Sequence, residues 1–403
     1  MVSTAQLCIY CKGSRNLCGL GKCPLLDKVK MKQNMKKIET DMFFGPSPSI
    51  FVGRVGYPNV FVGPLGNIGS SELSDEPSSW FNKEYDKIIE KRSLVLRSKY
   101  KQSVFSKSRF VEENQLLAMA NKPTDVEMEF NGKPVYRMSF SDIVQPMGPS
   151  VSVKNVKIVE NIKISRSVDK VVNDELKAND ATFILYKKNV DVYKLTNILS
   201  SGALGLEKNR KMTPTRWSIT ALDEIIGKNL MKAVREFPSL NEYRVYTSEF
   251  LHNKFVILLM PGNWEFENFE AWAPGSFWSF NLKKTEIIEE HEPFEGRWKY
   301  ASQGGGYYAS RLGVVEGLHA MKRQARVVVF REIYEGYVIP VGVWEVRENS
   351  RNAMRGHYEK FQTLKGALNY IKPKLRIPLE EYKKQSKILK QKRLGDFITL
   401  KSL

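Results

Sequence analysis

The sequence predicts a mixed α+β body with a small four-cysteine metal element at its N-terminus and a flexible tail at its C-terminus. The 403-residue chain is 42% hydrophobic and 27% charged, a globular composition with enough apolar residues for two domains. Segments with helical spacing alternate with short β-rich runs throughout the middle of the chain. The cysteines are confined to the start of the chain, and lysines crowd its end. We therefore expect four parts, with boundaries at 1–40, 41–205, 206–378 and 379–403.

The charge is concentrated at the two ends. The net charge is +19, and residues 1–40 contain eight Lys/Arg against two Asp/Glu, while residues 372–403 contain ten against three. Basic ends suit phosphate contact or charge steering, although lysines can also simply be solvated. The N-terminus lacks a signal-peptide pattern, and no apolar run approaches the roughly 18 residues of a membrane span. We expect a cytoplasmic protein with no membrane partner.

Cys8, Cys11, Cys18 and Cys23 have the spacing C-x2-C-x6-C-x4-C. Four thiolates can complete a tetrahedral zinc shell, and such a short loop cannot fold by burial alone. The sequence therefore predicts a structural zinc site. An iron–sulfur cluster, suggested by the Cys23-Pro24 ending, and unligated thiols are the alternatives.

The first half of the body is expected to mix both element types. Arg54 lies in a loop rich in Gly and Pro, where tight backbone could hold it at a ligand; a purely structural β-hairpin is the alternative. The expected strands and hairpins are Ile50–Val55, Asn59–Val62, Val126–Phe140 around Asn131-Gly132, Lys154–Ile164 and Thr182–Tyr186. The expected helices are Trp80–Tyr100, Arg109–Ala120, Val168–Leu176 and Val190–Ser200.

A helix start after Pro214 is a candidate phosphate or nucleic-acid site. Arg216 could hold a phosphate at the helix N-terminus, Trp217 could stack on a base, and Ser218 could cap the helix, which is expected to run through Leu230. A capped helix with a buried tryptophan is the alternative.

A second helix start follows the glycine run 304–306. Tyr307 or Tyr308 could stack on a ligand and Arg311 could hold a phosphate, but a flexible lead-in to a helix explains the same residues. Strand pairs are expected over Arg244–Met260 and over Ala325–Glu332 with Tyr337–Val346.

Glu265, Glu267 and Glu270 alternate with aromatic residues. Carboxylates at this density could hold a divalent metal for phosphodiester chemistry. A half-buried strand gives the same alternation, and the tighter Asp or Lys spacing of nucleases is missing. We therefore assign no catalytic residue, and whether the protein is an enzyme stays open.

The last predicted part, residues 379–403, is a basic, solvated helix and a tail. Gln391, Leu394, Phe397 and Ile398 would place a polar group and three apolar groups along one short turn. This pattern resembles the box with which replication and repair proteins bind the sliding clamp PCNA, except that Ile398 replaces the second aromatic residue. The resemblance implies PCNA as a partner; a frayed amphipathic helix end is the alternative.

The whole chain resembles the archaeal Nre family of DNA repair proteins. The resemblance is carried by the four cysteines, the stretches that start at Phe51, Pro214, Glu270 and Gly305, and the tail. It implies a DNA-repair protein recruited through PCNA, with the zinc element and basic surfaces contacting DNA. A nuclease or a nucleotide- or ADP-ribose-processing enzyme acting at damaged DNA is the first alternative, and an RNA-binding factor is the second.

Overall fold

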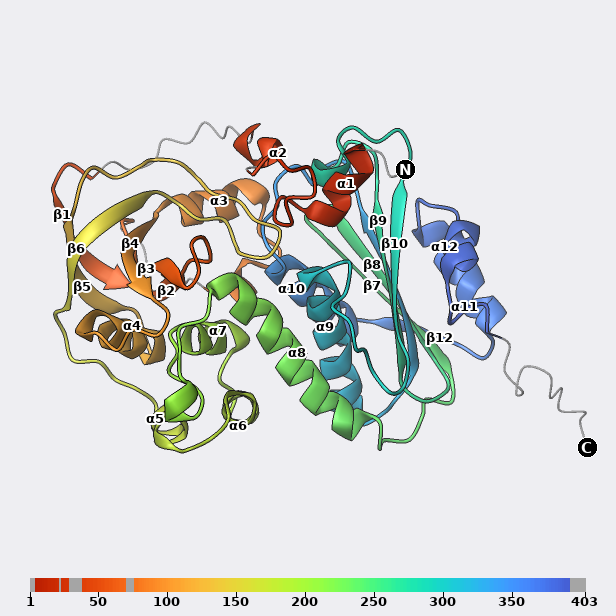
Figure 1. Cartoon of the computed structure of the whole chain (residues 1–403). Coiled ribbons are helices and arrows are strands. Elements are labelled where there is room, and N and C mark those ends of the chain that lie inside the picture. Colours follow the sequence, from red (N-terminus) through yellow and green to blue (C-terminus); the bar gives the residue numbers. More distant parts are fainter. Residues whose placement is uncertain (1–3, 22, 29–37, 70–75, 392–403) are drawn as a thin grey trace, which may run out of the picture. The chain divides into compact units, whose positions relative to one another are not determined.

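The chain forms two compact units, each built on a six-stranded sheet (Figure 1). The computed structural model describes residues 4–21, 23–28, 38–69 and 76–391. The N-terminal unit comprises Leu20–Asn229 and Ile339–Glu345. The C-terminal unit comprises Met1–Gly19, Leu230–Val338 and Val346–Leu403, so it includes both ends of the chain. The expected mixed α and β composition is confirmed.

The sheet of the N-terminal unit has the strand order β1-β5-β6-β4-β3-β2. Its strands are β1 (Met42–Ser47), β2 (Ser49–Val52), β3 (Asn59–Asn67), β4 (Val95–Ser103), β5 (Thr124–Phe130) and β6 (Ser150–Ile158). Neighbouring strands are antiparallel except β4 and β6, which are parallel. The helices are α2 (Pro24–Lys28), α3 (Tyr85–Ser93), α4 (Arg109–Met119), α5 (Arg166–Asn173), α6 (Ala178–Lys187), α7 (Val192–Ser200) and the first part of α8 (Thr215–Val234).

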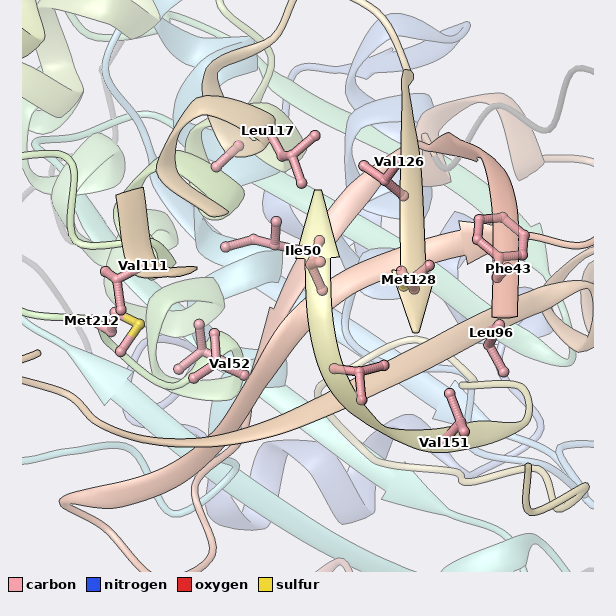
Figure 2. Packing of buried hydrophobic residues seen from close by; sticks show 14 of the residues in the cluster. Phe43, Ile50, Val52, Leu96, Val111, Leu117, Val126, Met128, Val151 and Met212 are labelled. Carbon is pink, nitrogen blue, oxygen red and sulfur yellow. The ribbon is translucent and has the colours of Figure 1, made fainter. Parts of the chain in front are cut away.

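One face of this sheet builds the core. Figure 2 shows Ile50, Val52, Leu96, Val126 and Val151 from four different strands gathered in the same interior. Val111 and Leu117 of α4 pack into the same cluster, which is why alternate strand residues are buried. The other face of the sheet is therefore left to carry polar and charged side chains.

The sheet of the C-terminal unit has the strand order β10-β9-β11-β8-β7-β12. Its strands are β7 (Tyr243–Phe250), β8 (Asn253–Met260), β9 (Glu265–Trp272), β10 (Glu286–Glu292), β11 (Arg326–Ile333) and β12 (Tyr358–Phe361). The helices are α1 (Thr4–Cys11), α9 (Gly305–Met321), α10 (Trp344–Arg355), α11 (Leu364–Ile371) and α12 (Leu379–Gln385). Helix α9 lies on one face of the sheet, and α11 and α12 lie on the other (Figure 1).

Several predicted elements are confirmed. The structure contains helices α4, α7 and α8 at the expected positions, and the expected hairpin of β7 and β8. At α7 the Asp191 side chain accepts a hydrogen bond from the backbone N–H of Tyr193 at 2.7 Å, which caps the helix.

Four predicted elements are wrong. The expected helix Trp80–Tyr100 ends at Ser93 and continues as β4, where side chains alternate between the two faces of the sheet. The expected strand Thr182–Tyr186 lies in α6, because short apolar runs do not distinguish helix from strand. The expected hairpin at Asn131-Gly132 does not form, since β5 pairs with β1 and β6. The expected pairing of Tyr337–Val346 is also absent: β11 pairs with β8 and β9.

The segment 379–390, predicted to be basic and solvated, packs against the sheet of the C-terminal unit. Leu379, Tyr382 and Ile388 are buried in the cluster that also contains Phe269 and Phe330. Its lysines do face solvent, but every third or fourth residue anchors it. The tail proper therefore starts near residue 391 rather than at 379.

Candidate nucleic-acid interface

The loop between β2 and β3 presents Arg54 and Tyr57 to solvent. Its backbone closes tightly, since the Tyr57 N–H donates to the carbonyl oxygen of Arg54 at 3.3 Å and the Asn59 N–H donates to that of Gly56 at 2.9 Å. Gly56 has φ +82°, and a Cβ there would lie 2.8 Å from the Asn59 carbonyl oxygen, so this turn requires glycine. The sequence pattern of Gly and Pro thus builds a short, well-defined loop.

The start of α8 lies beside this loop. The Thr215 hydroxyl accepts a hydrogen bond from the backbone N–H of Val52 at 3.0 Å, which joins the helix start to β2. Trp217 is 45% exposed, and its ring centroid lies 5.0 Å from that of Tyr57, with the planes inclined at 52°. The structure therefore brings two predicted site residues, Arg54 and Trp217, together with an aromatic residue that the sequence did not single out.

Two guanidinium groups lie near one carboxylate at this place, and one of them is bonded to it. Arg216 donates to Asp142 at 2.7 Å and to the Ser141 hydroxyl at 3.0 Å. Partial burial lowers the pKa of Arg54, and the cation of Arg216 lowers it further, whereas Asp142 opposes both. Within the described part of the chain Arg54 has no ion pair, so an incoming anion would relieve the repulsion between the two arginines. The exposed ring pair beside this charge suits a phosphate-bearing aromatic ligand.

Ser218 does not belong to this surface. It is buried, and its hydroxyl is 3.5 Å from the Thr213 carbonyl oxygen. The second predicted group, on α9, is also interior: Tyr307 and Tyr308 are buried and Arg311 is only 1% exposed.

The α9 residues take part in a buried network of the C-terminal unit. Glu292 accepts hydrogen bonds from Arg311 at 2.5 Å and from the Tyr307 hydroxyl at 2.9 Å. Burial and the charge of Glu292 raise the pKa of Tyr307 well above its ordinary value. The Tyr308 hydroxyl accepts from the backbone N–H of Ala301 at 3.1 Å. In this arrangement the three side chains hold the start of α9 against β10.

The three glutamates of β9 are also engaged inside the protein. Glu270 accepts from Lys12 at 2.6 Å and from Arg331 at 2.8 Å; burial alone would raise its pKa, but these two cations lower it. Glu265 lies between His291 at 2.9 Å and Arg326 at 3.0 Å. No group of three or more His, Cys, Asp or Glu side chains is placed to hold a metal ion in the described ranges.

Glu267 is held differently, because its partners are on the C-terminal segment. It accepts hydrogen bonds from the Ser386 hydroxyl and from the backbone N–H of Lys387, the latter at 2.5 Å. Burial raises the pKa of Glu267 from 4.5 to about 7, and the nearby Glu289 adds to the rise, while the two hydrogen bonds act in the opposite direction. This carboxyl therefore connects the sheet to the segment that precedes the tail.

None of the four cysteines, all of which lie within the described residues, forms a disulfide. Cys8 and Cys11 are three residues apart on α1 and so share one side of it, and Cys11 is buried while Cys18 is exposed. Reduced thiols paired at this spacing have the chemistry that zinc requires. The zinc site stays a prediction.

The tail lies at the limit of the described residues. Gln391 is exposed, and its backbone N–H donates to the Lys387 carbonyl oxygen at 3.2 Å. Leu394, Phe397 and Ile398, the apolar residues of the predicted clamp-binding motif, lie outside the described residues. Across the residues that are described, no helix is long and apolar enough to cross a membrane.

Comparison with known sequences decides the family. The model for the N-terminal part of archaeal Nre matches residues 17–279, and the model for its C-terminal part matches residues 292–399. The chain belongs to the archaeal Nre family. The second match extends across the tail motif, and the first begins between Cys11 and Cys18.

Three relatives, each named as a DNA repair protein, align with this chain over most of their length. NreB of Archaeoglobus fulgidus is 35% identical over 389 residues, covering 96% of this chain and 97% of the relative. NreA of the same organism is 38% identical over 365 residues (90% and 92%), and NreA of Haloferax volcanii is 35% identical over 359 residues (86% and 86%). No solved structure matches this Nre chain.

Residues Tyr57 and Asp142 complete the loop site and were not predicted. The signal for Tyr57 was present, since it lies in the same Gly- and Pro-rich run as Arg54. Asp142 lies 74 residues from Arg216 in a long connection between β5 and β6, where no local pattern indicates a partner.

The Glu267 carboxyl predicts a pH-dependent attachment of the C-terminal segment. The bound carboxyl is protonated up to about pH 7, whereas a released one ionises above about pH 4.5. Attachment should therefore be strongest below pH 4.5 and weaken by up to about 3 kcal/mol as the pH rises to 7. Hydrogen exchange of the backbone amides of residues 382–391, corrected for intrinsic rates, measures this change.

Glu267→Gln should flatten the pH dependence because it removes the titrating group. Glu380→Gln, which changes an exposed carboxylate of the same segment, should behave like the wild type. The same pH dependence in wild type and Glu267→Gln would contradict the assignment.

Proposed function

We propose that this Nre protein is a DNA-repair factor that is recruited to DNA by the sliding clamp PCNA through its C-terminal motif. Its family membership and the names of its relatives support a role in DNA repair. The observation that supports contact with DNA is the exposed ring pair of Tyr57 and Trp217 beside Arg54. Guanidinium groups bind phosphates and exposed rings stack on bases, so this surface fits a nucleic acid.

The enzyme alternative receives less support from the geometry. It requires Arg216 and Arg311 to meet one phosphate-bearing ligand. Arg311 is instead buried and paired with Glu292 within the C-terminal unit. The three β9 glutamates have protein partners of their own, which favours a structural role for them.

The loop site predicts specific losses of DNA binding. Trp217→Ala should weaken binding of a labelled oligonucleotide by about 1–3 kcal/mol, because a stacking surface is removed. Arg54→Gln should also weaken binding and lower its salt dependence, because one phosphate contact is lost. Fluorescence anisotropy over a salt series measures both effects.

Arg109→Gln is the matched control, since Arg109 is an exposed arginine of the same unit that pairs with Glu113 on α4. It should bind DNA like the wild type. If Arg54→Gln and Trp217→Ala bind DNA as tightly as this control, DNA does not bind at the loop.

If the tail recruits the protein to the clamp, changes in its motif should weaken PCNA binding. Each of Leu394→Ala and Phe397→Ala removes an apolar side chain worth roughly 1.5–3 kcal/mol when buried, so clamp affinity should fall at least about tenfold. Leu403→Ala, in the same tail but outside the motif, is the control. Calorimetry with the full-length chain and purified PCNA measures this affinity. An unchanged affinity in Phe397→Ala would contradict clamp binding through this motif.

The zinc proposal rests on four reduced thiols grouped near the N-terminus. The purified protein should contain about one zinc per chain by elemental analysis, bound by Cys8, Cys11, Cys18 and Cys23. Cys11→Ser and Cys18→Ser should each lower the content, since zinc prefers four intact ligands. Iron with visible absorbance would instead indicate an iron–sulfur cluster, and a metal-free protein would leave unligated thiols.

A further inference from the structure

The outward face of the N-terminal sheet carries a row of cations on β4. Leu96 and Ser98 of this strand are buried, so Arg97, Lys99 and Lys101 point to the opposite side. Alternate residues of a strand are about 6.6–6.8 Å apart, so the three charges form a regular line along the strand.

Among the described residues, no acid forms an ion pair with this row. Arg97 donates to the Met147 sulfur at 3.1 Å and Lys99 donates to the Ser150 hydroxyl at 2.7 Å. Taking only the described residues, none of the three cations forms an ion pair. Burial, with Arg92 nearby, lowers the pKa of Arg97 to about 10, so this guanidinium stays charged at neutral pH. Burial, with Arg97 nearby, also lowers the pKa of Lys99. Cations that are partly desolvated and repel one another are stabilised by a bound anion.

Aromatic rings lie beside the cations on the same face. The Phe51 ring centroid is 5.2 Å from the guanidinium carbon of Arg97. Phe61 of β3 stands directly opposite Lys101 of β4, and it is 45% exposed. A sheet face that combines aromatic rings with cations can stack unpaired bases while it binds their phosphates.

The acids on the other half of the same face have basic neighbours. On β5 the outward residues are Glu127 and Glu129; Lys157 of β6 stands opposite Glu127, and Lys154 of β6 lies 3.1 Å from Glu129. Phe44 of β1, which is 67% exposed, lies opposite Glu127. The cations of β4 have no such acidic neighbour among the described residues, so they define a narrow track along β3 and β4.

The track continues beyond the end of β4. Phe105 is exposed, and the Lys211 ammonium lies 5.7 Å from its ring centroid. The backbone N–H of Val104 donates to the Pro58 carbonyl oxygen at 2.9 Å, so this end of β4 adjoins the loop that contains Tyr57. The cation row and the loop site thus lie at one end of the same sheet.

We propose that the β3–β4 face of the N-terminal sheet, formed by Phe51, Phe61, Arg97, Lys99 and Lys101, binds single-stranded DNA. The choice of a single strand follows from the exposed rings, because base faces are available for stacking only where bases are unpaired. The choice of DNA over RNA rests on the proposed repair function.

The test uses the full-length protein and fluorescein-labelled oligothymidine of about 15 nucleotides, with a duplex of equal length and an oligouridine as competitors. The wild type should bind oligothymidine more tightly than either competitor. Phe61→Ala should raise the Kd about tenfold or more, because it removes a stacking ring. Lys101→Ala should raise the Kd and reduce the slope of log affinity against log salt by about 0.7.

Two variants on the same face are matched controls. Phe44→Ala removes a ring of greater exposure, and Lys154→Ala removes an exposed lysine that pairs with Glu129, both from the half of the face away from β3 and β4. Neither should change the Kd by more than about twofold. Phe61→Leu keeps apolar volume without a ring and should resemble Phe61→Ala, which separates stacking from a folding defect.

Several results would overturn the proposal. A single-strand track on β3 and β4 would be excluded if Phe61→Leu and Lys101→Ala bound oligothymidine like the wild type. It would also be excluded if Phe44→Ala lost as much affinity as Phe61→Ala, or if the wild type bound duplex more tightly than oligothymidine. Tighter binding of oligouridine would exclude DNA as the occupant. Clamp binding by the same variants should equal that of the wild type, so this test and the tail test can fail independently.

Discussion

The C-terminal unit depends on carboxylates that the central strands β9 and β11 carry on both faces of the sheet. On one face Glu270 binds Lys12, which fixes the N-terminal segment. On the other face Glu332 accepts four hydrogen bonds, from the hydroxyls of Tyr334 and Tyr382 and from the backbone N–H groups of Arg376 and Ile377. A buried charge is tolerated only when such partners are complete. Described segments near each end of the chain thus pack on this sheet, and attaching them completes its polar contacts.

The N-terminal unit uses its sheet in a different way. One face is an apolar core. On the other face, among the described residues, the cations of β4 lie beside rings without an acidic partner, whereas the acids of β5 lie beside lysines of β6. The cations of β4 that lack an acidic partner among the described residues therefore lie on the proposed binding surface. In the C-terminal unit, the charged side chains of β9 and β11 are paired inside the protein. The net charge of +19 alone does not reveal this division. Only the pairing of each carboxylate shows which cations are available to a ligand.

The parts of the fold that sequence predicted are those whose signals are local. The helix start after Pro214 and the hairpin of β7 and β8 depend on neighbouring residues. The errors arose where distant residues decide, as in β4, which reads as helix until its neighbours β3 and β6 are known. The site followed the same rule: Arg54 and Trp217 were found, but Arg311 has a partner on β10 that spacing could not indicate.

The attachment of Lys12 has a practical consequence for anyone who wishes to remove the cysteine-bearing segment. Ile9 and Cys11 are buried, Lys12 also donates to the Gln303 carbonyl oxygen at 2.9 Å, and Arg15 donates to that of Ser302 at 2.7 Å. A truncated chain that starts after residue 19 would leave the buried Glu270 with Arg331 but without Lys12, and would also lose the buried side chains of Ile9 and Cys11. Its defects would reflect a damaged scaffold rather than lost metal. Point replacement of individual thiols is therefore the sounder route to the chemistry of this segment.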